Sequence, residues 1–317
     1  MVKNPAQKTN DLVPYLVMLG TALCFSTNII FGRFVAPEAH PFVLAFIRWL
    51  LVALILSPLV FWRARGVLEF VRGNLFLLIV LSVLGMGVSG GGVYWGLQMT
   101  TATNATLIYS VAPVAIVVLE RIFKGRSISG REVIGAFVAF GGVATIVSQG
   151  TFTTFAQFQF NNGDILIAAA TLSWACYSIL LKSDRLKSVG AITLFCLIAF
   201  FGALVNLPFA FSSLAVGSGM PQSTAGWQAL AGIVVISSLM AFSAYQFGVR
   251  HLGPSLAGMF MFLMTPFGVL LAVFFLNETL EAYQMLAIVA VMVGVATATM
   301  PKRKLASTAE NSSAERA

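Results

Sequence analysis

Apolar residues dominate this chain in long runs that are separated by short polar joints. Ten runs approach the roughly 20 residues that an α-helix needs to cross a bilayer. They lie at about residues 12–32, 42–62, 75–98, 102–123, 132–149, 164–181, 189–212, 226–249, 254–277 and 282–300. Breakers such as Gly73-Asn74 and Gly253-Pro254 mark the joints. The pattern predicts an all-α, polytopic membrane protein of ten transmembrane helices.

Composition and charge agree with this prediction and orient the chain. The 317 residues are 58% hydrophobic and only 9% charged, whereas soluble domains carry about 25% charge. With a cytoplasmic N-terminus, all of the 19 Lys and Arg residues except Arg33 and Arg48 fall in cytoplasmic segments. This bias predicts a multi-pass membrane protein with both termini in the cytoplasm. The net charge of +8 is then topological, so no nucleic-acid partner is expected.

The chain also repeats itself at a nearly constant offset. Residues 23–33 resemble residues 172–182, and Gly142–Thr145 recurs as Gly294–Thr297. The repeat predicts two five-helix units, at residues 12–149 and 164–300, joined by an outer linker at residues 150–163. Cytoplasmic tails are expected at residues 1–11 and 301–317, and the second tail is expected to be disordered. Because five is odd, the second unit enters the membrane from the opposite side, which makes the repeat inverted. Inverted repeats place a substrate site near the midplane and support alternating access.

The most polar membrane-depth stretch, Gly85–Pro113, predicts a cavity wall. Polar groups at this depth are tolerated only against protein or water. Span three carries small residues at helical spacing, and span four carries a stripe of hydroxyls: Gly85, Ser89, Gly92 and Gly96, then Thr103, Thr106 and Ser110. Pro113 and Pro266 are expected to break spans four and nine. The alternative is tight helix packing with hydroxyls bonded to their own backbone.

Aromatic and amide side chains extend this predicted wall across several spans. Together they would form an aromatic, hydrogen-bonding pocket. The candidate substrate-binding residues are Asn28, Tyr94, Trp95, Gln98, Thr106, Tyr109, Ser110, Trp174, Tyr177, Ser238, Tyr245 and Gln246. Trp49, Trp62 and Trp227 are assigned instead to the interfacial aromatic belt.

Charged residues near the membrane have two interpretations each. Arg48 is the basic residue deepest in a span. It is either a counter-charge for a substrate carboxylate, or a structural arginine that binds carbonyls or extends toward the interface. Arg33 and Lys182 either guard the two mouths or anchor the interface. Glu278 is expected to cap or pair at the outer end of span nine.

Other classes of function lack the residues they need. No Asp or Glu lies mid-span, which favours a neutral or zwitterionic substrate. Gly87-Val88-Ser89-Gly90 matches an intramembrane serine protease pattern, but its base would have to be His251, which is predicted to lie in a loop. No phosphate-binding loop or metal-ligand cluster is evident, so no catalytic residue, metal or cofactor is expected. A channel or lipid scramblase remains an alternative.

Several motifs indicate a resemblance to a known family. They are Phe46–Trp49, the Pro113 and Pro266 helices, Gln246–Ser255 and Asn277–Leu280. Over residues 12–300 the chain resembles the drug/metabolite transporter superfamily, in particular ten-span exporters built from two EamA-type halves. One departure is that the acid after span nine, Glu278, is replaced in the first half by Gly125.

The resemblance implies an exporter of small neutral or zwitterionic metabolites in the bacterial inner membrane that works by alternating access. Amino acids are the expected substrates, with aromatic ones favoured, as in exporters of the YddG type. A nucleotide-sugar or sugar-phosphate antiporter is the alternative. The expected partners are the small-molecule substrate and the lipid bilayer, and a monomer would suffice for this activity.

Overall fold

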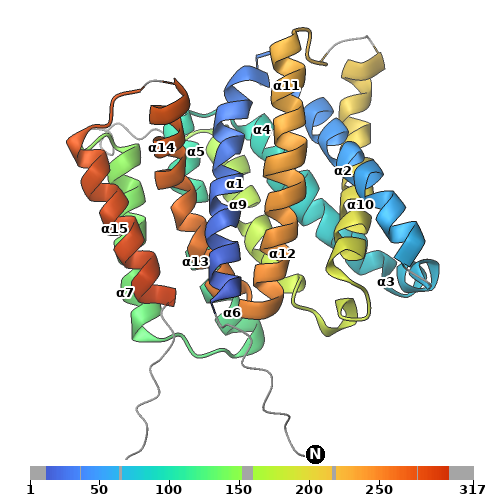
Figure 1. Ribbon diagram of the computed structural model, residues 1–317, viewed down its shortest axis with the longest axis horizontal. Coiled ribbons are helices and arrows are strands. Elements are labelled where there is room, and N and C mark those ends of the chain that lie inside the picture. Colours follow the sequence, from blue (N-terminus) through green and yellow to red (C-terminus); the bar gives the residue numbers. More distant parts are fainter. Residues whose placement is uncertain are drawn as a thin grey trace, which may run out of the picture.

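The computed structural model describes residues 12–35, 37–63, 66–151, 160–215, 219–276 and 278–299, which form helices and no strand (Figure 1). Within these ranges, 10 helical spans are long and apolar enough to cross a membrane. The predicted fold class is therefore confirmed. The predicted tails, 1–11 and 301–317, and most of the predicted linker lie outside the described residues.

The first five spans contain eight helical segments. They are α1 (Val13–Val35), α2 (Pro41–Arg63), α3 (Val67–Ser82), η1 (Val83–Gly91), α4 (Gly92–Gly96), α5 (Ala102–Tyr109), α6 (Ala112–Lys124) and α7 (Gly130–Val147). In the last five spans, the sixth, seventh and tenth are the single helices α9 (Asn162–Leu180), α10 (Ala191–Ala215) and α15 (Ala282–Thr299). The eighth span consists of α11 (Thr224–Gly232), η3 (Ile233–Met240) and α12 (Ala241–Leu252). The ninth consists of α13 (Pro254–Met259), η4 (Phe260–Leu263) and α14 (Met264–Leu276).

The third span begins earlier than the sequence predicted. Gly73 and Asn74, taken as a joint, lie inside α3. The Asn74 side chain donates to the Phe70 carbonyl one turn back, at 3.0 Å. Since this bond satisfies the amide within the helix, the asparagine does not end the helix as it would in a turn.

The bundle has two faces at which the spans are joined. We call the face where α1 begins and α15 ends the terminal face, and it lies at the lower edge of Figure 1. It also holds the joints 125–129 and 181–190. The distal face, at the other edge, holds the joints 97–101 and 219–223. α1 runs from the terminal to the distal face, whereas α9 runs in the opposite direction.

Irregular helix segments recur at matching positions in the two halves. The π-helices η1 and η3 interrupt spans three and eight, and their first residues, Val83 and Ile233, are 150 positions apart. α5 ends at Tyr109 and α13 at Met259, again 150 positions apart. Such irregularities frequently mark functional sites in helices. They place non-ideal backbone in spans three, four, eight and nine.

The π-helix also corrects the predicted small-residue stripe of span three. An added Cβ at Gly85 would contact the Tyr177 ring, and one at Gly96 would contact Ile167, so both glycines face α9. The Gly92 position meets only atoms of its own span. The prediction assumed uninterrupted α-helical spacing, which the wider turns of η1 break.

The fifth and tenth spans pack most closely through glycine. An added Cβ at Gly142 of α7 would lie 2.7 Å from the Ala287 carbonyl oxygen and from a Val291 methyl on α15. Such small residues let helix backbones approach, so that dispersion contacts hold helices together in lipid. The α7–α15 pair lies to one side of the bundle, away from α2 and α10 (Figure 1).

Replacing Gly142 with Ala should therefore destabilise the protein. The new methyl would collide with the α15 backbone, and overpacking of this kind costs about 1–3 kcal/mol. The matched control is Gly141→Ala on the same helix, because an added Cβ there meets nothing within 4 Å. Thermal unfolding in detergent should show a lower midpoint only for Gly142→Ala. Equal midpoints for both variants would contradict the close α7–α15 contact.

Candidate functional site

A cavity of about 280 Å³ lies among seven of the ten spans, in the half of the bundle nearer the distal face. Most of its polar lining comes from spans one to four, with Thr265 added from span nine, and its apolar lining includes residues of spans six, eight and nine. The lining residues are Phe25, Asn28, Arg48, Trp49, Ser89, Gly90, Val93, Tyr94, Leu97, Ala105, Thr106, Tyr109, Ser110, Ala112, Pro113, Ile167, Trp174, Phe242, Met261, Phe262, Met264 and Thr265.

Half of the predicted substrate-binding residues line this cavity. They are Asn28, Tyr94, Thr106, Tyr109, Ser110 and Trp174. They come from spans one, three, four and six, so residues distant in sequence meet at one site. Thr106 is exposed, and Leu97 at the distal end of the lining is exposed as well. The cavity therefore opens toward the distal face.

The helix breaks predicted at proline contribute to the cavity wall. Pro113 lies in the first turn of α6, and residues 110–111 separate it from α5. Pro266 lies in the first turn of α14, which follows the 3-10 segment η4. Proline is tolerated in a first turn because it lacks an N–H group that would need a partner. Both spans thus change helix type beside the cavity rather than kinking within an unbroken helix.

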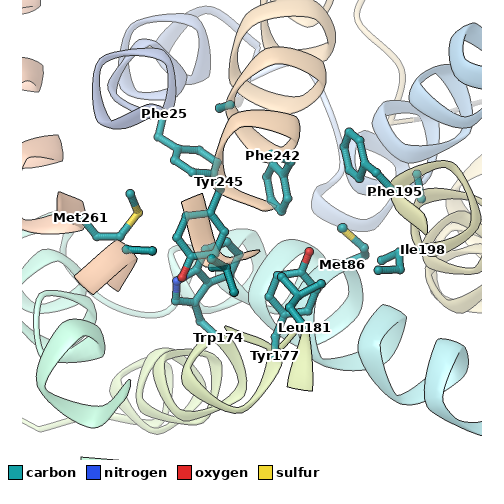
Figure 2. Close-up of a cluster of buried hydrophobic side chains, with 14 of the residues drawn as sticks. Phe25, Met86, Trp174, Tyr177, Leu181, Phe195, Ile198, Phe242, Tyr245 and Met261 are labelled. Atoms are coloured by element: carbon teal, nitrogen blue, oxygen red, sulfur yellow. The ribbon is translucent and has the colours of Figure 1, made fainter. Parts of the chain in front are cut away.

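Aromatic side chains form the floor of the cavity (Figure 2). The Trp174 ring lies 5.6 Å from Phe242 at 90°, and Phe25 lies 5.1 Å from Phe242 at 78°. These are edge-to-face arrangements, which aromatic pairs prefer. On its other side Trp174 is tilted against Tyr245 at 5.0 Å. The cluster leaves an aromatic surface facing the cavity and closes the bundle beneath it.

Trp49 corrects one sequence-based assignment. It was predicted in the interfacial belt, but it is 1% exposed and lines the cavity. Its ring lies 4.9 Å from that of Phe242. The reason is helix orientation: this face of α2 points inward against the π-helices of spans three and eight. Trp227, by contrast, is exposed on the bundle surface, and the Trp62 side chain lies outside the described part of the chain.

Arg48 is buried and lines the cavity from α2. Its Nε donates to the Ser238 hydroxyl at 2.5 Å, its Nη1 to the Tyr94 hydroxyl at 3.0 Å, and its Nη2 to the Ser237 carbonyl at 3.4 Å. Among the described residues no carboxylate pairs with it. The guanidinium therefore does not extend to the interface, whereas its bond to the Ser237 carbonyl fits the structural arginine of the second sequence-based interpretation.

Two predicted site residues lie elsewhere. Trp95 is 41% exposed and packs its ring 6.0 Å from Phe42. Gln98 is exposed in the joint after α4. The prediction grouped both with Tyr94 as one polar cluster. Because adjacent helical residues point in different directions, only Tyr94 of the three faces the cavity.

Four other predicted residues lie below or behind the cavity lining. Tyr177 and Tyr245 are fully buried, and the Tyr245 hydroxyl hydrogen-bonds Ser178 at 2.7 Å. Gln246 is buried, and its amide oxygen and nitrogen have no hydrogen-bond partner, nor has the Tyr177 hydroxyl. Ser238 contacts the cavity only through Arg48. Tyr177, Tyr245 and Gln246 are packed beneath the cavity, so this structure does not bring them into one lining with the other predicted residues.

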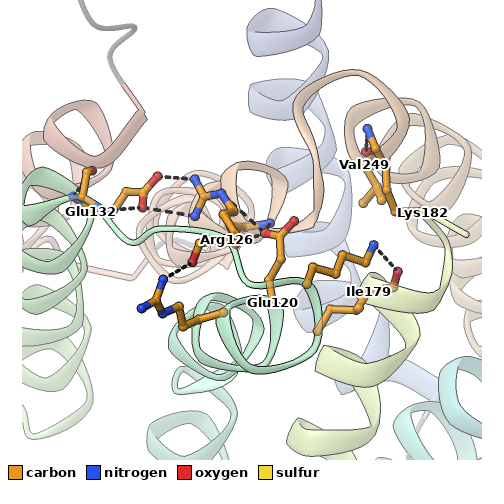
Figure 3. Close-up of polar contacts among 10 residues, drawn as sticks. Glu120, Arg126, Glu132, Ile179, Lys182 and Val249 are labelled. Atoms are coloured by element: carbon orange, nitrogen blue, oxygen red, sulfur yellow. Dashed lines mark hydrogen bonds and ion pairs between the residues drawn. The ribbon is translucent and has the colours of Figure 1, made fainter.

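Polar contacts tie the helices together at the terminal face (Figure 3). Glu120 of α6 accepts hydrogen bonds from the Ser255 backbone and hydroxyl at the start of α13. Arg126 bridges Glu120, at 3.8 Å, to Glu132 of α7. Since Glu120 and Ser255 are both buried, the contact seals the interface between spans four and nine.

Lys124 and Lys182 extend this seal to spans six and eight. Lys124 donates to the Ile179 carbonyl at 3.3 Å, and Lys182 donates to the Arg250 carbonyl at 2.7 Å. Partial burial and then the nearby Lys124 charge lower the pKa of Lys182. Cations satisfy helix C-terminal carbonyls favourably. Lys182 thus closes the terminal end of α12.

The distal face carries looser contacts. Arg33 pairs with Glu278 at 2.8 Å, as predicted for Glu278, but both side chains are about half exposed. An exposed pair contributes little to stability, typically below about 1 kcal/mol. Glu38 accepts hydrogen bonds from Ser223 and Gln222, which lower the pKa of its carboxyl. None of these contacts covers the cavity.

The contacts of Ser89 bear on the protease alternative. Its hydroxyl donates to the Ala170 carbonyl at 2.9 Å. His251 lies at the terminal end of α12, where its Nδ1 contacts the Phe247 carbonyl at 2.8 Å. A serine nucleophile needs a base within hydrogen-bond reach, and these two side chains do not meet. Over the described residues, no group of three or more metal-ligating side chains forms either.

The apolar part of the cavity lining was not predicted from the sequence. It includes Phe25, Phe242, Met261 and Phe262. Apolar residues fill every span, so their type alone gives no signal of which face is inward. One weak signal was available: Phe25 aligns with Trp174 in the 149-residue repeat. Both rings pack against Phe242, and this contact with a third span cannot be read from the alignment of Phe25 with Trp174.

Comparison with known proteins identifies the architecture. The chain is 28% identical to an uncharacterized transporter of Archaeoglobus fulgidus, over 89% of this chain and 95% of the relative. It is 23% identical to the uncharacterized transporter YyaM of Bacillus subtilis, over 90% and 92%. An S-adenosylmethionine uptake transporter of Rickettsia felis is 24% identical over 63% of this chain and 67% of its own.

A crystal structure of a protein with 17% identity shares the fold, with a TM-score of 0.71 over 90% of this chain and 96% of the other. The EamA-like transporter family matches residues 12–148 and again residues 161–300. These two matches cover the ten spans and the cavity between them. The protein is a membrane transporter and belongs to the EamA-like transporter family.

Proposed function

We propose that this transporter exports amino acids with aromatic or large apolar side chains from the cytoplasm, which the terminal face would contact. The observation that carries the proposal is the cavity: aromatic rings form its floor, and hydroxyl and amide groups from spans one, three and four line its wall. Pockets that bind small molecules combine apolar walls with a few orienting polar groups. The basic residues concentrated on the terminal side support the orientation.

The charges in the cavity favour a zwitterion over a polyanion. No Asp or Glu lines the cavity, and Arg48 is its one charged lining residue among those described. A nucleotide sugar or a sugar phosphate carries a doubly charged phosphate or more, which usually requires several Arg or Lys side chains. An amino acid presents one carboxylate, one ammonium and a side chain that suits the aromatic floor.

The difference between the two faces supports alternating access over a channel. The cavity opens at the distal face, whereas the terminal half is packed and sealed by Glu120–Ser255 and the two lysine contacts. Tyr94 of span three lines the cavity, whereas Tyr245 of span eight, the repeat-related span, is packed. A rocking motion that exchanges the environments of these two spans would expose Tyr245 to the pathway.

The unpartnered groups support the same exchange. The Gln246 amide and the Tyr177 hydroxyl are buried without hydrogen bonds, and a buried unpaired polar group costs about 1–3 kcal/mol. Opening of the terminal half would give them water or substrate as partners. In this interpretation the sequence-predicted residues Tyr177, Tyr245 and Gln246 line the pathway in the opposite state.

Substrate identity can be tested with purified protein in liposomes. Wild-type protein should exchange radiolabelled tryptophan or phenylalanine, and Trp174→Ala should raise the KM by about tenfold through loss of aromatic contact. Trp227→Ala, an exposed surface position, should leave the KM unchanged. S-adenosylmethionine and a sugar phosphate serve as competitors. Absence of amino-acid flux together with flux of the phosphorylated solute would refute the proposed substrate class.

The open and sealed halves can be mapped by cysteine labelling. Cys24, Cys176 and Cys196 would first be replaced, and one cysteine then introduced at Thr106 or at Gln246. A membrane-impermeant thiol reagent added at the distal side should modify the Thr106 position rapidly. The Gln246 position should react at least tenfold more slowly, since it is 1% exposed. Similar rates at the two positions would exclude the sealed terminal half.

The terminal seal makes a separate prediction about Ser255. Ser255→Ala removes the hydroxyl that Glu120 binds, and a bond of this kind is worth about 1 kcal/mol or more. A cysteine at position 246 should then react about fivefold faster with reagent from the terminal side. The matched control is Ser57→Ala, because Ser57 bonds only the Leu54 carbonyl of its own helix. No acceleration by Ser255→Ala would mean that the seal lies elsewhere.

A further inference from the structure

We propose that Arg48 is the anion subsite of the cavity and holds the substrate by a single carboxylate. This inference deepens the proposed function, because it names the substrate group that the cavity recognises. It requires that each transported substrate carry a carboxylate, and that related amines and esters bind weakly. Arg48 is buried, has no counter-charge among the described residues, keeps N–H donors free and is held in place by neighbouring side chains.

The Arg48 charge is not neutralised by the protein. The side chain is 6% exposed, yet its partners among the described residues are two hydroxyls and a carbonyl. The buried carboxylates Glu120 and Asp164 lie at opposite ends of the bundle, where they bond Ser255 and Thr100. A charge at membrane depth is costly unless something pairs with it. The cavity is therefore the side from which a counter-charge can reach this guanidinium.

The number of free N–H donors on Arg48 also supports a carboxylate site. A guanidinium has five N–H groups in a planar fork, and the structure assigns three of them to Ser238, Tyr94 and the Ser237 carbonyl. Two N–H groups remain, one on each terminal nitrogen. A carboxylate accepts two parallel hydrogen bonds from such a fork. A single buried arginine can thus bind a monocarboxylate and still keep its protein contacts.

Neighbouring groups hold the guanidinium in a fixed orientation. The Tyr94 hydroxyl accepts from Arg48 and donates to Asn28 at 3.3 Å. The Ser238 hydroxyl accepts from Arg48 and donates to the Ile233 carbonyl, five residues back, at 2.7 Å. That spacing belongs to the π-helix η3. The irregular turn of span eight therefore orients a hydroxyl that an α-helical turn would place differently.

Aromatic faces explain how the cation persists while the cavity is empty. The Arg48 guanidinium carbon lies 4.6 Å from the Trp49 ring centre and 5.7 Å from that of Phe242. Ring faces attract cations, but more weakly than a paired carboxylate does in a desolvated site. Both rings also line the cavity. A ligand carboxylate at Arg48 would thus place the adjoining apolar body against the aromatic floor.

Equilibrium binding to purified protein tests the subsite without requiring transport. The probes are phenylacetate, phenethylamine and phenyl phosphate, which share one ring and differ in charge. Wild-type protein should bind phenylacetate at least tenfold more tightly than the other two. Arg48→Gln should weaken phenylacetate binding by about 10- to 100-fold without weakening phenethylamine binding. Arg48→Lys keeps the charge but loses the fork, and should fall between wild type and Arg48→Gln.

Controls separate a binding defect from a folding defect. Arg72→Gln removes a positive charge from an exposed position on α3 and should bind phenylacetate like wild type. Each variant should retain the wild-type elution volume and a cooperative thermal transition. If Arg48→Gln unfolds, Arg48→Lys provides the second test, since it keeps the charge but loses the planar fork and should weaken phenylacetate binding without weakening phenethylamine binding.

The outcomes distinguish this inference from the proposed function. Arg48-dependent phenylacetate binding without amino-acid flux would uphold the subsite and refute the proposed function. Amino-acid flux that Arg48→Gln leaves unchanged in KM would uphold the function and overturn the subsite. Phenyl phosphate binding more tightly than phenylacetate would also overturn it, in favour of a phosphate site.

Discussion

The absence of water in a bilayer is the constraint on which this structure depends. Each buried polar group must find a partner within the protein, because an unpaired one is costly in hydrocarbon. Across most of the bundle the helices meet this demand with their own backbone bonds, and side-chain hydroxyls such as Thr21 and Ser178 bond carbonyls of the preceding turn. Among the described residues, His40, Trp49, Tyr177, Asn206 and Gln246 keep buried polar atoms without a partner. The polar groups at the cavity and directly beneath it are the exceptions that bear on transport.

Those exceptions form two sets that differ in state rather than in chemistry. Arg48, Tyr94 and Asn28 are linked to one another and face open space. Tyr177 and Gln246 are packed shut with unpartnered polar atoms. A protein with one stable arrangement would gain by replacing the second set with apolar residues. Their retention is consistent with a second arrangement in which they are solvated, as alternating access requires.

The contacts at the terminal face are of a kind that can break in the alternating access that we propose. Glu120 and Ser255 join two spans through hydrogen bonds, while apolar contacts between Ile116 and Gly258 continue the interface toward the midplane. Hydrogen bonds contribute modest net stability when water can replace the partner. Next to this interface, α7 and α15 interlock through glycine and alanine backbone contacts. The close α7–α15 pair is suited to move as one body.

The sequence by itself determined the ten spans and the polar stretch of spans three and four, because hydrophobic length and polarity act locally along the chain. It also singled out Asn28, Tyr94, Arg48 and Trp174, since polar and aromatic groups are conspicuous against an apolar background. Only the tertiary structure decided which faces are inward. It moved Trp49 to the cavity and Trp95 to the surface, and it packed Tyr177 and Tyr245 into a closed half. The reason is that helix rotation, π-turns and the state of opening depend on contacts between spans, which no local pattern records.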